Sequence, residues 1–91
     1  MRAYEITAIL LDKGTIVEET KTSIKEILTK YSVEITSEED MGQKKLWHTI
    51  GGNETGYFTY IKCKAEPSSI AKLVGEFKLN QNILKSLIVK G

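Results

Sequence analysis

The segment Thr55–Lys64 has the two-residue period of a β-strand with one buried face. One face would carry residues that can join a core: Tyr57, Thr59, Ile61 and Cys63. The other would carry two aromatic rings followed by two cations: Phe58, Tyr60, Lys62 and Lys64. Rings stack on bases or pack against proteins and lysines contact phosphate, so this second face suits RNA or a protein partner. The alternative is an amphipathic strand whose aromatic residues shield a sheet face.

The composition predicts one globular domain over residues 1–91. Apolar residues make up 41% of the chain and charged residues 27%, as in ordinary soluble domains. No apolar run approaches the roughly 20 residues that cross a bilayer, and Glu5, Asp12 and Lys13 interrupt any stretch resembling a signal peptide. The single cysteine, Cys63, cannot form an internal disulfide. We therefore expect a cytoplasmic protein in a reducing compartment.

Charge is unevenly distributed, although the net charge is only +1. Residues 1–40 contain five Lys or Arg against nine Asp or Glu, whereas residues 41–91 contain eight lysines against three glutamates. The second part is therefore the one that favours an anionic partner. Twelve of the thirteen cations are lysines, which favour point contacts with phosphate over bidentate recognition of bases.

Hydrophobic periods predict the element order β-α-β-β-α-β. Strands are expected at 3–11, at 33–50 with a bend or bulge at Met41-Gly42, at 55–64 and at 83–89. Helices are expected from a capping box at 15–18 to about residue 31, and from Pro67 to a stop at 80–82. The glycine-rich segment 51–56 is expected to be a hairpin loop.

This order predicts an α+β, ferredoxin-like fold, with a four-stranded antiparallel sheet and two helices on one face. In the first strand, Tyr4, Ile6, Ala8 and Leu10 share one side. The face without helices would carry Phe58 and Tyr60 and, depending on the parity of the last strand, Leu87 and Val89 beside Lys85. Such an apolar open face indicates that a partner covers it.

The residue pattern predicts no enzyme, metal site or cofactor. His48 and Cys63 are the only soft metal ligands and have no partner at motif spacing. The acidic run 38–40 is expected to be solvated, and the glycines of 51–56 join two strands instead of a strand and a helix, unlike a phosphate-binding loop. An acylphosphatase-type reaction would need an arginine after the first strand, and the only arginine is Arg2.

The RNA-recognition motif has the same element order, but its signature does not fit. Its RNP1 pattern begins with a cation, a glycine, an aromatic residue, a small residue and an aromatic residue. Here Thr55 stands in the place of the cation, and in Gly56-Tyr57-Phe58-Thr59-Tyr60 there is one residue too many before the aromatic pair repeats. We therefore do not predict an orthodox recognition motif.

Several short motifs, ordered over almost the whole chain, carry a more specific resemblance. They are Arg2–Ile6, Glu39–Leu46 with Ile50, Gly56–Phe58, Glu66-Pro67, Phe77–Asn80 and Ile83–Leu87. In this order and spacing they resemble the bacterial small-subunit ribosomal protein six family.

The resemblance implies a ferredoxin-like structural protein that helps assemble the small ribosomal subunit in the cytoplasm, with no catalysis, cofactor, membrane or small-molecule substrate. Family members bind the central domain of small-subunit ribosomal RNA together with ribosomal protein eighteen. Positions matching RNA-facing residues of the family are Arg2, Lys44, Lys45, Asn80 and Lys85. We assign the docking face for the protein partner to Tyr4, Trp47, Phe58, Tyr60 and Lys62.

The chain departs from the family pattern in places. Trp47-His48-Thr49 stands where the family usually has Ala-Tyr-Pro, which removes a proline and adds a larger ring. Arginines common in the family's last turn and final strand are lysine or neutral here. The alternative function is a small-ligand-sensing or regulatory module on the same fold, which would form a homodimer with a pocket between subunits.

Overall fold

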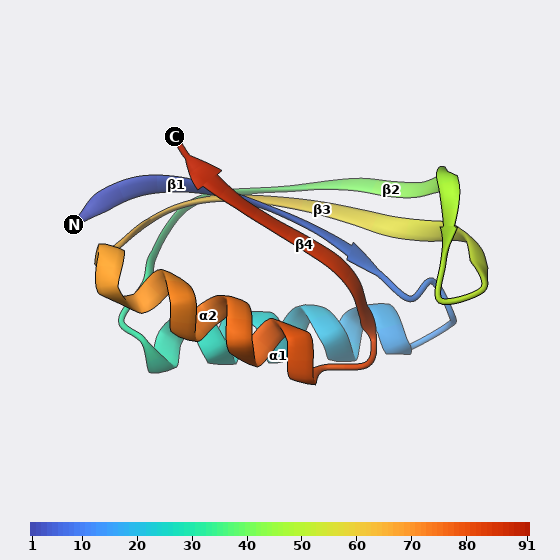
Figure 1. Cartoon of the computed structure of the whole chain (residues 1–91), viewed down its shortest axis with the longest axis horizontal. Helices are drawn as coiled ribbons and strands as arrows, with labels where there is room; N and C mark the ends of the chain where they lie inside the picture. The colour runs from blue at the N-terminus through green and yellow to red at the C-terminus, as the bar shows by residue number, and fades with distance from the viewer.

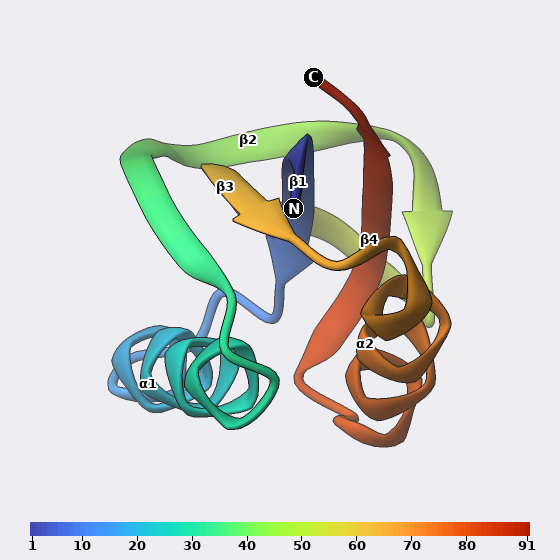
Figure 2. The same ribbon diagram turned by 90° about the vertical axis from the view of Figure 1, so that its left-hand side faces the viewer.

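The computed structural model describes residues 1–91 and has the predicted element order. The elements are β1 (Arg2–Leu10), α1 (Ile16–Lys30), β2 (Glu34–Ile50), β3 (Asn53–Ala65), α2 (Pro67–Leu79) and β4 (Ile83–Lys90). The sheet order is β2-β3-β1-β4, and all neighbouring strands are antiparallel. Both helices lie below the sheet in Figures 1 and 2, which leaves the upper face open. The predicted ferredoxin-like fold is confirmed.

The core lies between the sheet and the two helices. Successive strand residues point to opposite faces, so the central strands bury every second side chain. The buried residues of β1 are Tyr4, Ile6, Ala8 and Leu10, and β3 buries Thr59, Ile61 and Cys63 on the same face, as predicted. The helices add Ile24 and Leu28 from α1 and Leu73 and Phe77 from α2. Neither helix is long and apolar enough to cross a membrane.

Helix α1 begins close to the predicted residue, but the Thr15 side chain does not cap it. The Thr15 hydroxyl makes no capping hydrogen bond, and the residue itself has helical backbone angles, φ −73° and ψ −11°. A side-chain cap needs an extended backbone at that residue so that its oxygen reaches the free amides of the first turn. The predicted capping box is therefore wrong. Glu18 and Glu19 still place negative charge in the first turn, where the helix dipole favours it.

Strand β2 is one continuous strand of 17 residues with a bulge at Met41. Asp40 pairs with Thr59 and Gly42 pairs with Phe58, so Met41 is the extra residue. Gly42 has a φ of +80°, a left-handed conformation that glycine adopts without the steric penalty of a Cβ. The predicted bend or bulge is confirmed, and beyond it β2 continues to the hairpin end at the right of Figure 1.

The turn between β2 and β3 is shorter than predicted. Gly51 and Gly52 have φ values of +57° and +81°, the left-handed pair typical of a two-residue hairpin turn. Residues 53–56 already belong to β3, so the predicted loop over 51–56 is wrong for four of its six residues. Gly56 serves close packing instead, because a Cβ there would lie 2.5 Å from Ile9 Cγ2.

Candidate functional site

The open face of the sheet carries a row of apolar and aromatic side chains from three of its four strands, β3, β1 and β4. Phe58 and Tyr60 on β3 pair with Ile9 and Thr7 on β1. On β4, Lys85, Leu87 and Val89 point to this face, with Leu87 56% and Val89 44% exposed. The sequence alone left open which residues of the last strand face outward, and these positions answer that question. The open face is apolar at its centre, as expected of a surface that meets a partner.

Tyr60 is held in place by a carboxylate on the neighbouring strand. Its hydroxyl donates a hydrogen bond to Glu5 Oε1. This bond, with partial desolvation and the negative charges of Glu5 and Glu39, raises the pKa of the Tyr60 phenol. Lys62 is the strand partner of Glu5 and is exposed. Tyr60 and Lys62 thus both lie on the open face, where the docking prediction assigned them.

Tyr4 does not lie on that face. It is only 7% exposed and belongs to the main core cluster, on the side of the sheet that the helices cover. The alternation of β1 decides this, because Tyr4 has the same parity as Ile6 and Ala8. Its assignment to the docking face is corrected.

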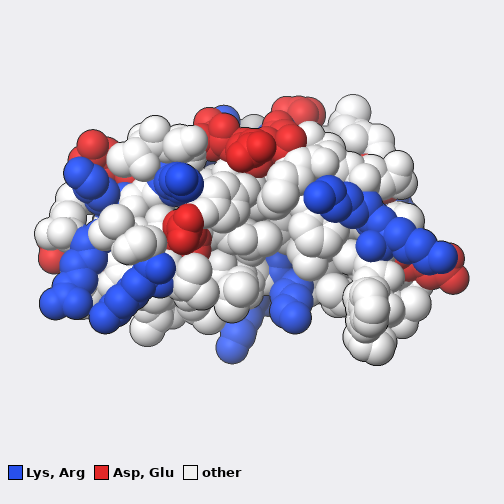
Figure 3. All heavy atoms as spheres, turned by 90° about the horizontal axis from the view of Figure 1, so that it is seen from above, with Lys and Arg blue, Asp and Glu red and all other residues white.

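The predicted RNA-facing cations lie at two ends of the sheet. Figure 3 looks down on the open face and shows Lys and Arg atoms at both ends and at the lower edge, with a group of Asp and Glu atoms along the upper edge. Arg2 pairs with Ala65, whereas Lys44 pairs with Gly56, nine residues away along β3. At about 3.3 Å per strand residue this separation is roughly 30 Å. Arg2 and Lys44 therefore cannot contact the same phosphate group.

Lys44 and Lys45 differ in direction, because consecutive strand residues alternate. Lys44 shares the side of its neighbours Gly42 and Leu46, and Leu46 packs near Gly56 toward Ile9 on the open face. Lys45 points to the other side of the hairpin. Both lysines are exposed. A single flat RNA surface would therefore meet one of them more directly than the other.

Lys85 lines a groove between α2 and the outer edge of β4, and Asn80 lies in the loop that joins these two elements. The groove has a volume of about 320 Å³ and is lined by Val74, Phe77, Lys78, Ile83, Leu84, Lys85 and Ser86. Its only charged residues are two lysines. Asn80 Oδ1 accepts the backbone N–H of Asn82 at 2.9 Å, so the Asn80 side chain shapes the loop that leads into this groove. Sequence reasoning missed Lys78, although it lies within the motif Phe77–Asn80.

Lys85 also lines a hollow on the open face, at the end where β2 and β3 meet. The hollow has a volume of about 240 Å³ and is lined by Ile9, Leu46, Trp47, His48, Ile50, Phe58 and Lys85. Trp47 is 93% exposed. Its indole meets the His48 ring edge-on, with centroids 6.5 Å apart and planes at 78°. No carboxylate lines this hollow, so its electrostatic character is set by lysine.

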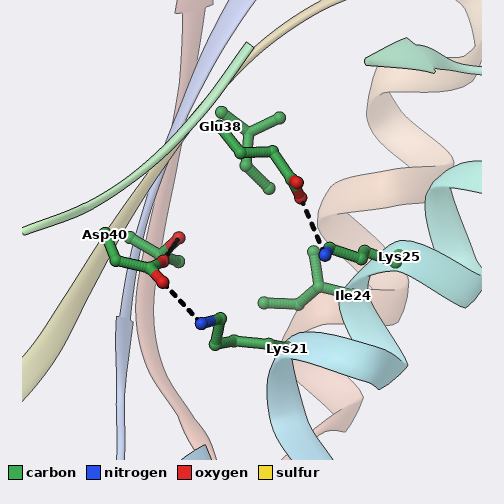
Figure 4. A pocket seen from close by; sticks show the side chains of 7 residues that line it. Lys21, Ile24, Lys25, Glu38 and Asp40 are labelled. Atoms are coloured by element: carbon green, nitrogen blue, oxygen red, sulfur yellow. Dashed lines mark hydrogen bonds and ion pairs between the residues drawn. The ribbon is translucent and has the colours of Figure 1, made fainter. Parts of the chain in front are cut away.

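A third groove lies between α1 and β2 on the helix side of the sheet, where Figure 4 shows two ion pairs crossing it. Lys21 Nζ lies 2.6 Å from Asp40 Oδ2, and Lys25 Nζ lies 3.2 Å from Glu38 Oε1. The Thr59 hydroxyl donates to Asp40 Oδ1 at 3.1 Å. The acidic run 38–40 was expected to be solvated, and its three residues are exposed; Glu38 and Asp40 are in addition paired with lysines of α1.

These contacts shift the pKa values of both residues in the shorter ion pair, Lys21 and Asp40. The hydrogen bond from Lys21 lowers the pKa of Asp40, and the same bond raises the pKa of Lys21. The groove has a volume of about 230 Å³, but the lysines and carboxylates around it are already paired with one another. We therefore assign it a structural role, which is to tie the edge strand β2 to α1.

The side chains that sequence reasoning weighed for catalysis lie apart. Cys63 is buried in the core, and burial raises the pKa of its thiol. His48 lies near the tip of the β2–β3 hairpin, whereas Cys63 pairs with Tyr4 and Ile35 at the far end of the sheet. No group of three His, Cys, Asp or Glu side chains is arranged to hold a metal ion.

Comparison with known proteins identifies the family. The profile of the family described as ribosomal protein S6 matches residues 3–90. The chain belongs to the ribosomal protein S6 family. A relative from Leptospira biflexa, named small ribosomal subunit protein bS6, is 53% identical over 90 residues, covering 99% of this chain and 97% of the relative. A Sulfurovum relative of the same name is 33% identical over 94 residues; the match covers 99% of this chain and 72% of the length of the relative.

Solved structures agree with the S6 fold. The crystal structure of 30S ribosomal protein S6 from Thermotoga maritima matches with a TM-score of 0.90 at 19% identity, covering 99% of this chain and 87% of that one. The C-terminal domain of the MgtC protein from Mycobacterium tuberculosis matches with a TM-score of 0.67 at 13% identity, covering 100% and 88%. The second match shows that the fold alone does not select a function. The S6 assignment rests on the sequence relatives.

Proposed function

We propose that this S6 protein binds the central domain of small-subunit ribosomal RNA together with ribosomal protein eighteen, as a structural component with no catalytic activity. The observation that carries the proposal is the open sheet face, which is apolar at its centre and bordered by lysines at the end where β2, β3 and β4 come together. Apolar surface suits a protein partner, and lysines suit phosphate. One side of the molecule thus offers both kinds of contact.

Membership of the S6 family makes the chain a protein of the small ribosomal subunit, and therefore a ribosome-bound protein of the cytoplasm. The family is one of structural ribosomal proteins.

For RNA we propose two contact regions. The first is the hairpin and β4 end, where Lys44, Lys45 and Lys85 are exposed and Lys78 lines the adjoining groove. The second is the chain's amino-terminal end, where Arg2 lies about 30 Å from Lys44 along the sheet. Asn80 contributes by fixing the loop between α2 and β4. An RNA that reaches both regions must be extended along the sheet.

For the protein partner we propose the middle of the open face. Phe58 and Tyr60 form its aromatic part, Leu87 and Val89 its aliphatic part, and Lys62 its charged border. The hydrogen bond from Tyr60 to Glu5 fixes one ring before any partner arrives. A pre-ordered side chain loses less conformational entropy on binding.

The test is a binding measurement with the central-domain RNA, with and without ribosomal protein eighteen. We expect weak binding by this protein alone and much tighter binding when the partner is added. Changing Lys44 and Lys45 together to Ala should reduce the slope of log K against log salt by up to about two. The matched control is Lys25→Ala, on the helix side of the molecule, which should leave the slope unchanged.

Two results would contradict the proposal. Equal RNA affinity with and without ribosomal protein eighteen would remove the joint mechanism. Free migration of the protein, away from the small subunit, when a low-salt cell extract is sedimented would remove the ribosomal role altogether.

A further inference from the structure

Trp47 is exposed to a degree that the fold does not explain. Its indole is 93% exposed at the end of the sheet, and its one aromatic neighbour is the edge-on ring of His48. It lines the open-face hollow beside Phe58 and Ile9. A tryptophan in that position contributes almost no buried area to the folded chain, although its ring carries the largest apolar surface of any side chain.

The surroundings of the hollow favour an anionic occupant. Lys85 lines the hollow and also lines the α2–β4 groove, where Lys78 is the second cation. On β2, Lys44 pairs with Gly56 and has the same strand parity as Leu46, which lines the hollow. A negatively charged chain in the groove would therefore pass directly beside the hollow.

We propose that the hollow receives one unpaired RNA base, which stacks on Trp47 while its phosphate contacts Lys85. The inference rests on the proposed RNA binding and names its stacking site. The volume of about 240 Å³ is below the roughly 300 Å³ at which pockets for drug-sized ligands begin, so it suits a single flat ring. Stacking tolerates any base, because every base has a π-face.

This assignment moves Trp47 from the protein-docking face to the RNA-binding region. A protein side chain would also fit an apolar hollow, but nothing in its lining would pair with a protein's cations, and the cations at its border match phosphate. The exposed aliphatic residues Leu87 and Val89 remain for the protein partner.

Fluorescence gives a direct test, since Trp47 is the only tryptophan. Central-domain RNA should quench the emission of the intact protein and shield it from acrylamide. Trp47→Ala should weaken RNA binding by about 5- to 150-fold, the range for loss of one stacked base. Trp47→Phe keeps a ring and should recover most of the affinity, whereas Trp47→Leu should behave like Trp47→Ala.

The salt dependence separates this inference from the proposed function. Trp47→Ala should leave the log–log salt slope unchanged, because it removes no phosphate contact, whereas Lys85→Ala should lower it by about one. RNA binding that keeps its lysine dependence, without quenching and with full affinity for Trp47→Ala, would overturn the stacking site alone. No RNA binding by the intact protein would overturn both. Quenching by ribosomal protein eighteen without RNA would make the hollow a protein site and overturn the inference.

Discussion

Gly56 offers a quantitative test of the packing under the open face. In Gly56→Ala the added methyl carbon would lie 2.5 Å from Ile9 Cγ2, and 3.5 Å from both Leu10 O and Leu46 Cδ2. Carbon atoms pack best at about 3.5–4.0 Å, so one of the two residues must move by roughly 1 Å. Ile9 resists this movement, because its branched side chain is stiff at χ1 and its backbone is paired on both sides, to Phe58 and Lys85.

The expected cost follows from these contacts. Overpacking of this kind destabilises by about 1–3 kcal/mol, while replacing glycine restricts the unfolded chain and returns about 0.4–1 kcal/mol. We therefore expect Gly56→Ala to lower the free energy of unfolding by about 1–2 kcal/mol. For a domain of this size that corresponds to a fall in Tm of about 5–15 °C. Urea denaturation followed by circular dichroism measures it.

Two matched controls test whether the cost of Gly56→Ala comes from the clash with Ile9. Gly75→Ala adds a methyl group within α2 that meets nothing within 4 Å, so it should stabilise the protein by about 0.5–1 kcal/mol. Ile9→Ala removes the clashing methyl group, so Gly56→Ala should cost much less in that background, whereas Ile9→Val keeps a γ-methyl and should not rescue. An equal cost of Gly56→Ala in the wild-type and Ile9→Ala backgrounds would refute the steric explanation.

Two further predictions concern titratable groups. Because the pKa of Asp40 is lowered by Lys21, this carboxylate stabilises the fold above the ordinary Asp pKa of about 3.9, and the contribution is lost as pH falls through its lower folded value. Asp40→Asn should reduce stability near neutral pH by less than about 1 kcal/mol, since the pair is half-exposed, and flatten the acid limb of the stability profile; an unchanged acid limb would contradict this. The raised pKa of Tyr60 acts in the opposite pH range, with a contribution present below the ordinary Tyr pKa of about 10 and lost as pH rises through the folded value. In an absorbance titration, Tyr60→Phe should remove a late-ionising phenol; an unchanged late phase would count against the Glu5 contact.

Local patterns were enough to predict the fold. The two-residue period of β1 and β3 places their core residues correctly, and Met41-Gly42 marks the bulge, because these features depend on the chain's own neighbours. The RNA-facing lysines came from the family resemblance and stay predictions. The alternation of β1 correctly placed Tyr4 with the core residues, whereas the family match assigned it to the docking face.

The missed features depend on which elements lie side by side. Gly56 belongs to β3 because it pairs with Lys44 of β2, and the Ile9 side chain of β1 leaves no room for a Cβ there; segment 51–56 alone gives no sign of these neighbours. The pairing of Glu38 and Asp40 with α1 likewise needs the position of the helix. The hollow beside Trp47 combines residues of all four strands, so no single motif could have revealed it.

The place of β1 in the sheet affects how this protein is made. β1 is the first strand of the chain, yet it pairs with β3 on one side and with the last strand, β4, on the other. During synthesis β1 emerges long before either of its partner strands. Its core residues cannot make their native contacts until β3 and β4, which are distant in sequence, have been synthesised. The nascent chain therefore cannot complete its sheet until β4 has left the ribosome that made it.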